Sequence, residues 1–334
     1  MGEFLASYGL FIAKTITILI FFIIVLGLLA SSRRKPEGGE LSINHLNEKY
    51  TQMKQALHSV MLDKKQFKQL AKQHKKEQKE AVKEDKKRLF VIDFEGDVKA
   101  TAVASLRDEV TAILTAAIEG DEVLVRLNNS GGIVHEHGLA ASQLVRFKDA
   151  GIPLTVAVDK VAASGGYMMA CVADKVLAAP FAIVGSIGVI AQLPNFNRLL
   201  DKAGVDFEQH TAGEYKRNVT MFGKNTKKER EQLREQLEGI HDLFRDFVIK
   251  YRPDLDMTKV GTGEYWYGSK ALELGLVDEL LISDDYLLKC VEAKEVYQVS
   301  MAMKKSVVEK LVKGGASLYE QLIDVITSRS NNTH

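Results

Sequence analysis

A run of small residues between an apolar strand and an apolar helix constrains this chain most. Leu154–Val158 predicts a strand, and the residues from Tyr167 onward suit a buried helix. Between them, residues 162–166 read Ala-Ala-Ser-Gly-Gly. A hydroxyl at such a junction lies where backbone N–H groups are unpaired and favour negative charge. Ser164 is therefore either a helix N-cap, the commoner use of such a serine, or a nucleophile beside an oxyanion hole.

Strands and helices alternate from residue 89 onward. We expect strands at residues 89–94, 122–127, 154–158, 175–178 and 187–191, and helices at residues 103–118, 133–147 and 226–251. This alternation is typical of βαβ units with right-handed crossovers. The sequence therefore predicts an α/β fold.

Composition and motifs argue against several classes of function. Lys+Arg (45) and Asp+Glu (44) nearly cancel over 334 residues, so the net charge does not indicate nucleic-acid binding. Cys171 and Cys290 form no zinc-like grouping, and no dinucleotide or P-loop fingerprint is present. His135 and His137 point apart on a helix, which disfavours a shared metal. We therefore expect no metal and no cofactor.

An apolar segment near the N-terminus predicts a membrane anchor within residues 1–35. Residues 4–30 are almost wholly apolar, interrupted by Lys14, and reach the roughly 20 residues that a spanning helix needs. A cleaved signal peptide is the alternative, but the run is long for one and lacks a good cleavage site. The basic residues 33–35 place the following part in the cytoplasm by the positive-inside rule, whereas Lys14 and the N-terminal amine argue for the opposite side.

The next segment, residues 36–88, reads as a basic helical connector. From Lys49 to Arg88 it holds thirteen Lys/Arg against five Asp/Glu, with no Pro or Gly. A thin apolar stripe recurs at helical spacing: Met53, Leu57, Val60, Phe67 and Leu70. The stretch suits a helix on anionic lipid, a helix packed against its own copies, or a solvated spacer.

Two further glycine turns follow expected strands. Residues 128–132 read Asn-Asn-Ser-Gly-Gly and expose backbone amides, either as an ordinary turn or as half of an oxyanion hole. Residues 185–189 read Gly-Ser-Ile-Gly-Val. Lys216 lies among mixed charges, so on its own it is typical of a solvated surface lysine.

Four motifs together resemble a known family. They are residues 162–167 (Ala-Ala-Ser-Gly-Gly-Tyr), residues 185–189, Gly213-x-Tyr215-Lys216, and residues 271–279 (Ala-x-x-x-Gly-Leu-Val-Asp-Glu), in that order. They resemble the signal peptide peptidase A family of bacterial membrane proteases, and most closely its SohB branch. The resemblance covers roughly residues 40–285.

The resemblance implies a Ser–Lys dyad. Ser164 is then the nucleophile, Lys216 the general base, and Ser186 a hydrogen-bonding partner of the lysine amine. Backbone N–H groups of Gly131 and Gly165 would form the oxyanion hole. The family's glycine turn is usually Ser-Pro-Gly-Gly, and this chain lacks that proline.

A lysine base must be neutral to accept the serine proton. A free lysine is protonated at neutral pH, and burial in an apolar pocket lowers its pKa. Lys160, four residues from Ser164, is a rival base, although the end of a strand favours its pointing to solvent or an acidic partner. No convincing Ser-His-Asp set is present.

The family also implies an architecture. We expect a ClpP/crotonase-like spiral of βαβ units at residues 89–285, followed by a C-terminal helix and polar tail at residues 286–334. The working form would be a homo-oligomer that shares active sites between subunits, so a monomer would be inactive. The family places the protease domain outside the cytoplasm of a bacterial inner membrane, against the charge pattern, and this is our expectation.

The leading hypothesis is therefore a membrane-anchored endopeptidase that cuts unfolded or membrane-released peptides such as signal peptides. One alternative is a crotonase-like acyl-CoA enzyme, which shares the fold and a two-amide oxyanion hole but usually needs a carboxylate at this turn. Another is a catalytically silent membrane scaffold whose connector binds lipid or proteins.

Overall fold

The computed structural model describes residues 8–12, 14–19, 22, 39–70, 87–213, 216 and 219–302. The chain divides into two compact units, one of Met1–Leu41 with Met301–His334 and one of Ser42–Ser300. In the first unit, the described residues between 8 and 22 are helical. No described helix is long and apolar enough to cross a membrane. Most of the expected anchor and the helix expected beyond residue 304 lie outside the described residues.

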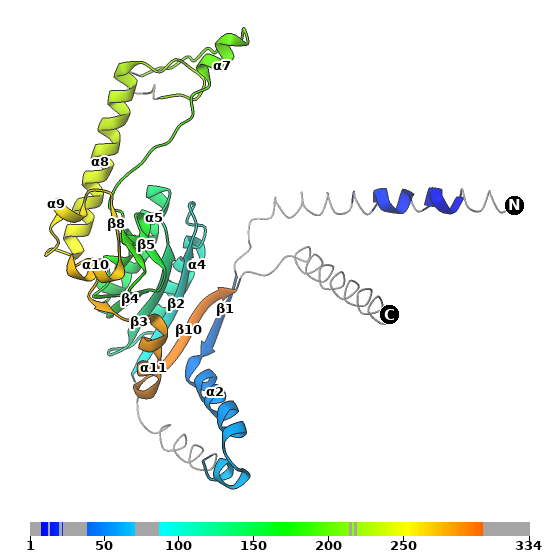
Figure 1. The fold of residues 1–334 in the computed structure, drawn as a ribbon, viewed down its shortest axis with the longest axis vertical. Helices are drawn as coiled ribbons and strands as arrows, with labels where there is room; N and C mark the ends of the chain where they lie inside the picture. The colour runs from blue at the N-terminus through cyan, green and yellow to red at the C-terminus, as the bar shows by residue number, and fades with distance from the viewer. Residues whose placement is uncertain are drawn as a thin grey trace, which may run out of the picture. The chain divides into compact units, whose positions relative to one another are not determined.

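The unit Ser42–Ser300 is built on one largely parallel sheet (Figure 1). The main path of the sheet runs β1-β10-β2-β3-β4-β6-β9, with β5 pairing β3 and β7, and β8 pairing β7. The strands are β1 (Glu40–His45), β2 (Arg88–Gly96), β3 (Glu122–Asn129), β4 (Leu154–Val158), β5 (Val161–Ala163), β6 (Lys175–Ala178), β7 (Ile183–Gly185), β8 (Tyr265–Tyr267), β9 (Glu279–Leu280) and β10 (Glu295–Ala302).

Helices pack against both faces of this sheet. The helices described in this unit are α2 (Leu46–Met61), α4 (Val103–Ala116), α5 (Val134–Asp149), α6 (Gly165–Ala170), α7 (Asn197–Lys202), α8 (Lys227–Tyr251), α9 (Met257–Val260), α10 (Gly268–Glu273) and α11 (Ser283–Ala293). Helix α7 has no buried residue and lies away from the sheet (Figure 1). Along β2, Phe90 and Ile92 pack with the α4, α5 and α6 side, while Leu89 and Val91 pack with Leu46 and the α11 side. Burial on both faces explains why these strands read as continuous apolar runs.

The sequence-based element assignments are largely confirmed. The strands at residues 154–158 and 175–178 have the predicted bounds, and the helix at residues 226–251 is α8. The strand expected at residues 187–191 is wrong, because the strand there is β7, which ends at Gly185. Residues 161–163 form the short strand β5, which the sequence analysis did not separate from its turn.

The sheet also continues past the expected end of the domain at residue 285. Strand β10 pairs in parallel with β2, with Val296 opposite Leu89. Helix α11 leads into it and buries Leu287 in the same core. The described sheet therefore takes in residues that the sequence analysis assigned to a C-terminal tail.

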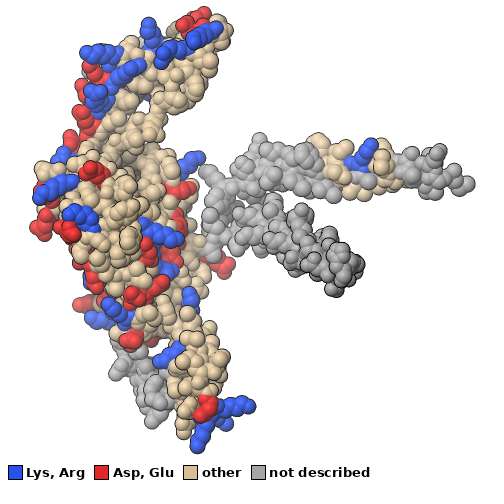
Figure 2. Space-filling view, in the orientation of Figure 1, with Lys and Arg blue, Asp and Glu red and all other residues tan. Residues whose placement is uncertain are grey.

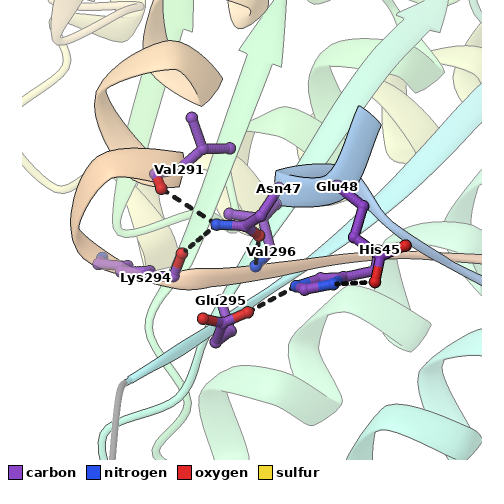
Figure 3. A network of polar contacts seen from close by, with 7 residues as sticks. All are labelled: His45, Asn47, Glu48, Val291, Lys294, Glu295 and Val296. Atoms are coloured by element: carbon purple, nitrogen blue, oxygen red, sulfur yellow. Dashed lines mark hydrogen bonds and ion pairs between the residues drawn. The ribbon is translucent and has the colours of Figure 1, made fainter. Parts of the chain in front are cut away.

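The start of α2 is fastened to the end of α11 by one amide side chain (Figure 3). Asn47 Nδ2 donates to the carbonyls of Val291 (3.0 Å) and Lys294 (2.8 Å), and its Oδ1 accepts from Val296 N–H (2.7 Å). Beside it, His45 Nε2 lies 2.5 Å from Glu295 Oε2. Asn47 thus satisfies two carbonyls at the C-terminus of a helix and one strand amide at once.

We expect Asn47→Ala to lower the free energy of unfolding by about 1–3 kcal/mol, because three backbone groups lose their partner. Thermal unfolding of the purified full chain measures the effect. The control is Asn44→Ala, since Asn44 is exposed on β1. Equal melting temperatures for the two variants would contradict a stabilising role of the three Asn47 side-chain hydrogen bonds.

Candidate active site

Three parallel strands end side by side at the candidate site. Asn129 of β3 is paired with Ala162 of β5, and Ala162 is paired with Val184 of β7. Two residues beyond each of these positions lie Gly131, Ser164 and Ser186. Adjacent strands are about 4.8 Å apart, so the register sets these three residues in a row. This row is the part of the predicted site that the structure brings together.

Ser164 has a strained backbone geometry at the strand-to-helix junction. Its φ is 53° and its ψ is −119°, in a region that costs a non-glycine residue roughly 1–3 kcal/mol. Its N–H donates to Gly185 O (2.8 Å) and its carbonyl accepts from Met168 N (3.0 Å). Although it occupies the N-cap position of α6, its side chain makes no capping hydrogen bond. The ordinary N-cap interpretation therefore does not describe this serine.

Burial and a hydrogen bond from Tyr167 hold helix α6 in place and thereby fix the turn that carries Ser164. All of its residues are buried, and Tyr167 Oη donates to Leu276 O (3.0 Å). Burial strongly raises the pKa of the Tyr167 hydroxyl, so this group stays neutral. Burial likewise raises the pKa of the Cys171 thiol, so this cysteine is an inert part of the core.

The glycine turn after β3 packs directly against Ser164. Gly131 has φ 85°, and a Cβ built on it would lie 2.8 Å from Ser164 Cβ, Ala163 O and Gly165 N. Its N–H, however, donates to Asn129 Oδ1 (2.8 Å). The next residue, Gly132, lines the hollow beside Ser164 together with Gly165. The Gly131 N–H is thus engaged by Asn129, whereas Gly132 lines the hollow.

The hollow beside Ser164 has an apolar lining. Its other lining residues are Val134, Met168, Gly188, Val189, Ile240 and Phe244. Helix α8 supplies the last two and is fixed over the loop after β7, because His241 Nε2 lies 3.0 Å from Ile187 O. A chain segment entering here would meet hydrocarbon rather than charge.

Neither of the two predicted general bases, Lys216 and Lys160, lines the hollow beside Ser164. Lys216 is exposed and is not among the residues that line the hollow. Figure 2 shows Lys and Arg side chains gathering over α7 and the adjoining end of α8. The rival base Lys160 is exposed and precedes β5, whereas Ser164 follows this strand, so the two lie at its opposite ends. Ser186 has φ 54° and its Oγ donates weakly to Gly263 O (3.4 Å).

Two residues near the turn were missed by sequence reasoning. Asn129 is 1% exposed and His137 is 0% exposed, and both lie behind the glycine turn. From the sequence, His137 was weighed only with His135 as a shared metal site, which their spacing disfavoured; in the structure His135 is exposed and His137 is buried. No group of three metal-ligating side chains occurs in the part of the chain that the structure describes. The signal for Asn129 was its place two residues before the first glycine, which is typical of an Asx turn.

Comparison with known proteins gives consistent relatives. The family model "Peptidase family S49 N-terminal" matches residues 3–144 and the model "Peptidase family S49" matches residues 146–297. "Probable protease SohB" of Haemophilus influenzae is 46% identical over 342 residues, covering 98% of this chain and 96% of that protein. "Probable protease SohB" of Buchnera aphidicola subsp. Acyrthosiphon pisum is 47% identical over 310 residues, covering 92% of each. "Putative signal peptide peptidase SppA" of Enterococcus faecium is 33% identical over 174 residues, covering 51% of this chain and 50% of that protein.

We expect Gly131→Ala to destabilise the protein by about 1–3 kcal/mol, because a Cβ at this positive φ would press on the backbone of residues 163 and 165. The matched control is Gly138→Ala in α5, where nothing lies within 4 Å of the new Cβ. The control should be neutral or stabilising by up to about 1 kcal/mol. Thermal unfolding of both variants checks this, and the reverse order would contradict the described turn.

A second prediction concerns acid stability at the base of α6. Burial opposes ionisation of Asp278, but the Arg252 guanidinium, at 2.8 Å, outweighs it and lowers the pKa of this carboxyl. A lowered folded-state pKa stabilises the protein above the unfolded value of about 3.9, and this contribution is lost as the pH falls through the folded value. Asp278→Asn should therefore cost about 1 kcal/mol at pH 7. The melting temperatures of wild type and variant should converge below pH 4; a constant difference would contradict this.

Proposed function

The chain belongs to peptidase family S49, as its four motifs indicate, and from this premise we propose a serine peptidase with Ser164 as nucleophile and Lys216 as general base. Peptidase activity is supported by the family and by its protease-named relatives. The observation that carries the serine assignment is the uncapped Ser164 at positive φ, set in register between the glycine turn and Ser186. We keep the expected ClpP/crotonase-like fold as part of the proposal.

The proposed reaction uses one proton carrier. Ser164 Oγ attacks the peptide carbonyl while the neutral Lys216 amine takes the hydroxyl proton. The lysine then gives this proton to the leaving amine as the C–N bond breaks, and an acyl-enzyme remains. A water molecule, deprotonated by the same lysine, releases the acyl group and regenerates Ser164.

We assign the oxyanion site to the amides of Gly165 and Gly132. The Gly165 N–H is the first amide of α6, beside the nucleophile, and Gly132 lines the same hollow. This revises the expectation for Gly131, whose N–H is held by Asn129. Donors fixed in the backbone stabilise the developing negative charge without reorganisation.

The general base is proposed to come from a neighbouring subunit. Lys216 is four residues from Thr220, whose N–H donates to Asn225 Oδ1 (2.8 Å) just before α8. Ile240, at the hollow, is fourteen residues beyond the N-cap Thr226, which is about 21 Å along the helix. A second copy would therefore have to bring its lysine to the hollow and desolvate it, with Ser186 as a hydrogen-bonding partner.

The apolar hollow supports unfolded or membrane-released peptides as substrates, signal peptides among them. The apolar residues 4–30 support attachment to a lipid bilayer, and we propose that the peptidase unit lies on the extracytoplasmic side of a bacterial inner membrane. A homo-oligomer on the membrane would place the shared sites where such peptides are released.

The test is hydrolysis of an unfolded protein by the detergent-solubilised oligomer. We expect Ser164→Ala and Lys216→Ala each to lower kcat by at least about 1000-fold, because nucleophile or base is lost. Mixed oligomers of the two inactive variants should regain part of the activity, since some sites then combine an intact Ser164 with an intact Lys216 of another subunit. The matched controls are Ser142→Ala and Lys160→Ala, which should retain wild-type rates.

The other possible results of these experiments would each contradict a different part of the proposal. Inactive mixtures of assembled variants would contradict a base supplied between subunits. Loss of activity in Lys160→Ala, with Lys216→Ala unaffected, would reassign the base. An inert wild type whose Ser164 no serine-reactive probe labels would favour the scaffold hypothesis, and turnover of acyl-CoA would favour the crotonase-like one.

A further inference from the structure

Two polar side chains lie fully buried behind the glycine turn. Asn129 ends β3 and His137 lies in the first turn of α5. A buried polar group without a partner destabilises the fold, and an apolar side chain of similar size would fill the same space without this requirement. The contacts that Asn129 and His137 make must therefore account for the presence of polar side chains at these buried positions.

The Asn129 side chain fixes the glycine turn. Its Oδ1 accepts the Gly131 N–H (2.8 Å), and its Nδ2 donates to Met169 Sδ (3.4 Å) on α6. A flipped amide would direct its NH₂ at the Gly131 N–H, so this contact determines the orientation of the side chain. Because Gly132 follows directly, the same bond constrains the position of this residue, which lines the hollow.

The His137 ring fixes the other side of the site. Its Nε2 lies 3.2 Å from Asn129 Oδ1 and its Nδ1 lies 3.0 Å from Ile133 O. The ring packs so closely on Gly165 that a Cβ on this residue would overlap ring atoms. The backbone carbonyl of Asn129 packs equally closely on Gly166. One connected pair of side chains therefore contacts both glycine-containing segments that line the hollow.

We propose that Asn129 and His137 are positioning residues that hold the Gly132 and Gly165 amides at the separation required by a tetrahedral oxyanion. This proposal rests on the proposed function. Neither side chain reaches the hollow, so neither touches substrate. Their effect is on the transition state, because the spacing of two donors matters most when the full negative charge has formed.

The test separates this role from simple packing. In the full-length oligomer, Asn129→Leu and His137→Phe should lower kcat by about 10- to 100-fold, with KM within about twofold of wild type. Asn129→Ser should recover much of the rate, because a serine hydroxyl also accepts an N–H two residues ahead. His137→Gln should do the same through its amide donor. The matched controls are Asn128→Leu and the exposed His135→Phe.

A peptide boronate gives an independent readout, since its tetrahedral adduct mimics the oxyanion state. Its affinity should fall by the same factor as kcat/KM in Asn129→Leu and stay near wild type in Asn129→Ser. Wild-type kcat in both Asn129→Leu and His137→Phe would overturn the proposal, as would equal losses in the conservative and apolar variants. If Asn129→Leu does not fold, Asn129→Ala replaces it and is read in the same way.

Failure of this proposal differs from failure of the proposed function. An active Ser164→Ala would remove the serine mechanism itself. An inactive Ser164→Ala together with a fully active Asn129→Leu would overturn only the positioning role.

Discussion

The parallel register of β3, β5 and β7 is the constraint on which the site depends. Hydrogen bonding between short strands places Gly131, Ser164 and Ser186 in one row, although they are 33 and 22 residues apart in the chain. A slip of one residue would turn each side chain to the opposite face of the sheet. The strained backbone of Ser164 persists because β5, α6 and the Gly185 carbonyl hold it from three sides.

Buried polar groups beside this row show how the fold supports the turn that carries Ser164. The core around α6 is otherwise apolar, yet it contains Asn129, His137 and the hydroxyl of Tyr167, each with a partner. These partners are backbone atoms, another member of the set and the Met169 sulfur. The side chains of Asn129 and His137 therefore contact the glycine turn and the start of α6, the two segments that line the hollow, without lining it themselves.

The sequence predicts the local helices and strands and the turn that carries Ser164, but it does not predict which side chains and backbone groups bond to each other. The strand at residues 154–158, the helix at residues 226–251 and the Ser164 turn follow from periodicity and small residues. The direction of the Gly131 amide depends on a side chain bonded across the turn, which no periodic pattern reports. The strand expected at residues 187–191 failed because this stretch is a loop in which Ile187 is buried but Ile190 is 77% exposed, so its apolar run does not report burial in the sheet.

The central claim is that Ser164 is a nucleophile activated in the assembled protein. The most direct measurement is mass spectrometric mapping of a fluorophosphonate adduct on the oligomer. The account predicts one adduct, on Ser164, in wild type and little labelling in Lys216→Ala. An adduct on another serine, or equal labelling of Ser164 without Lys216, would contradict it.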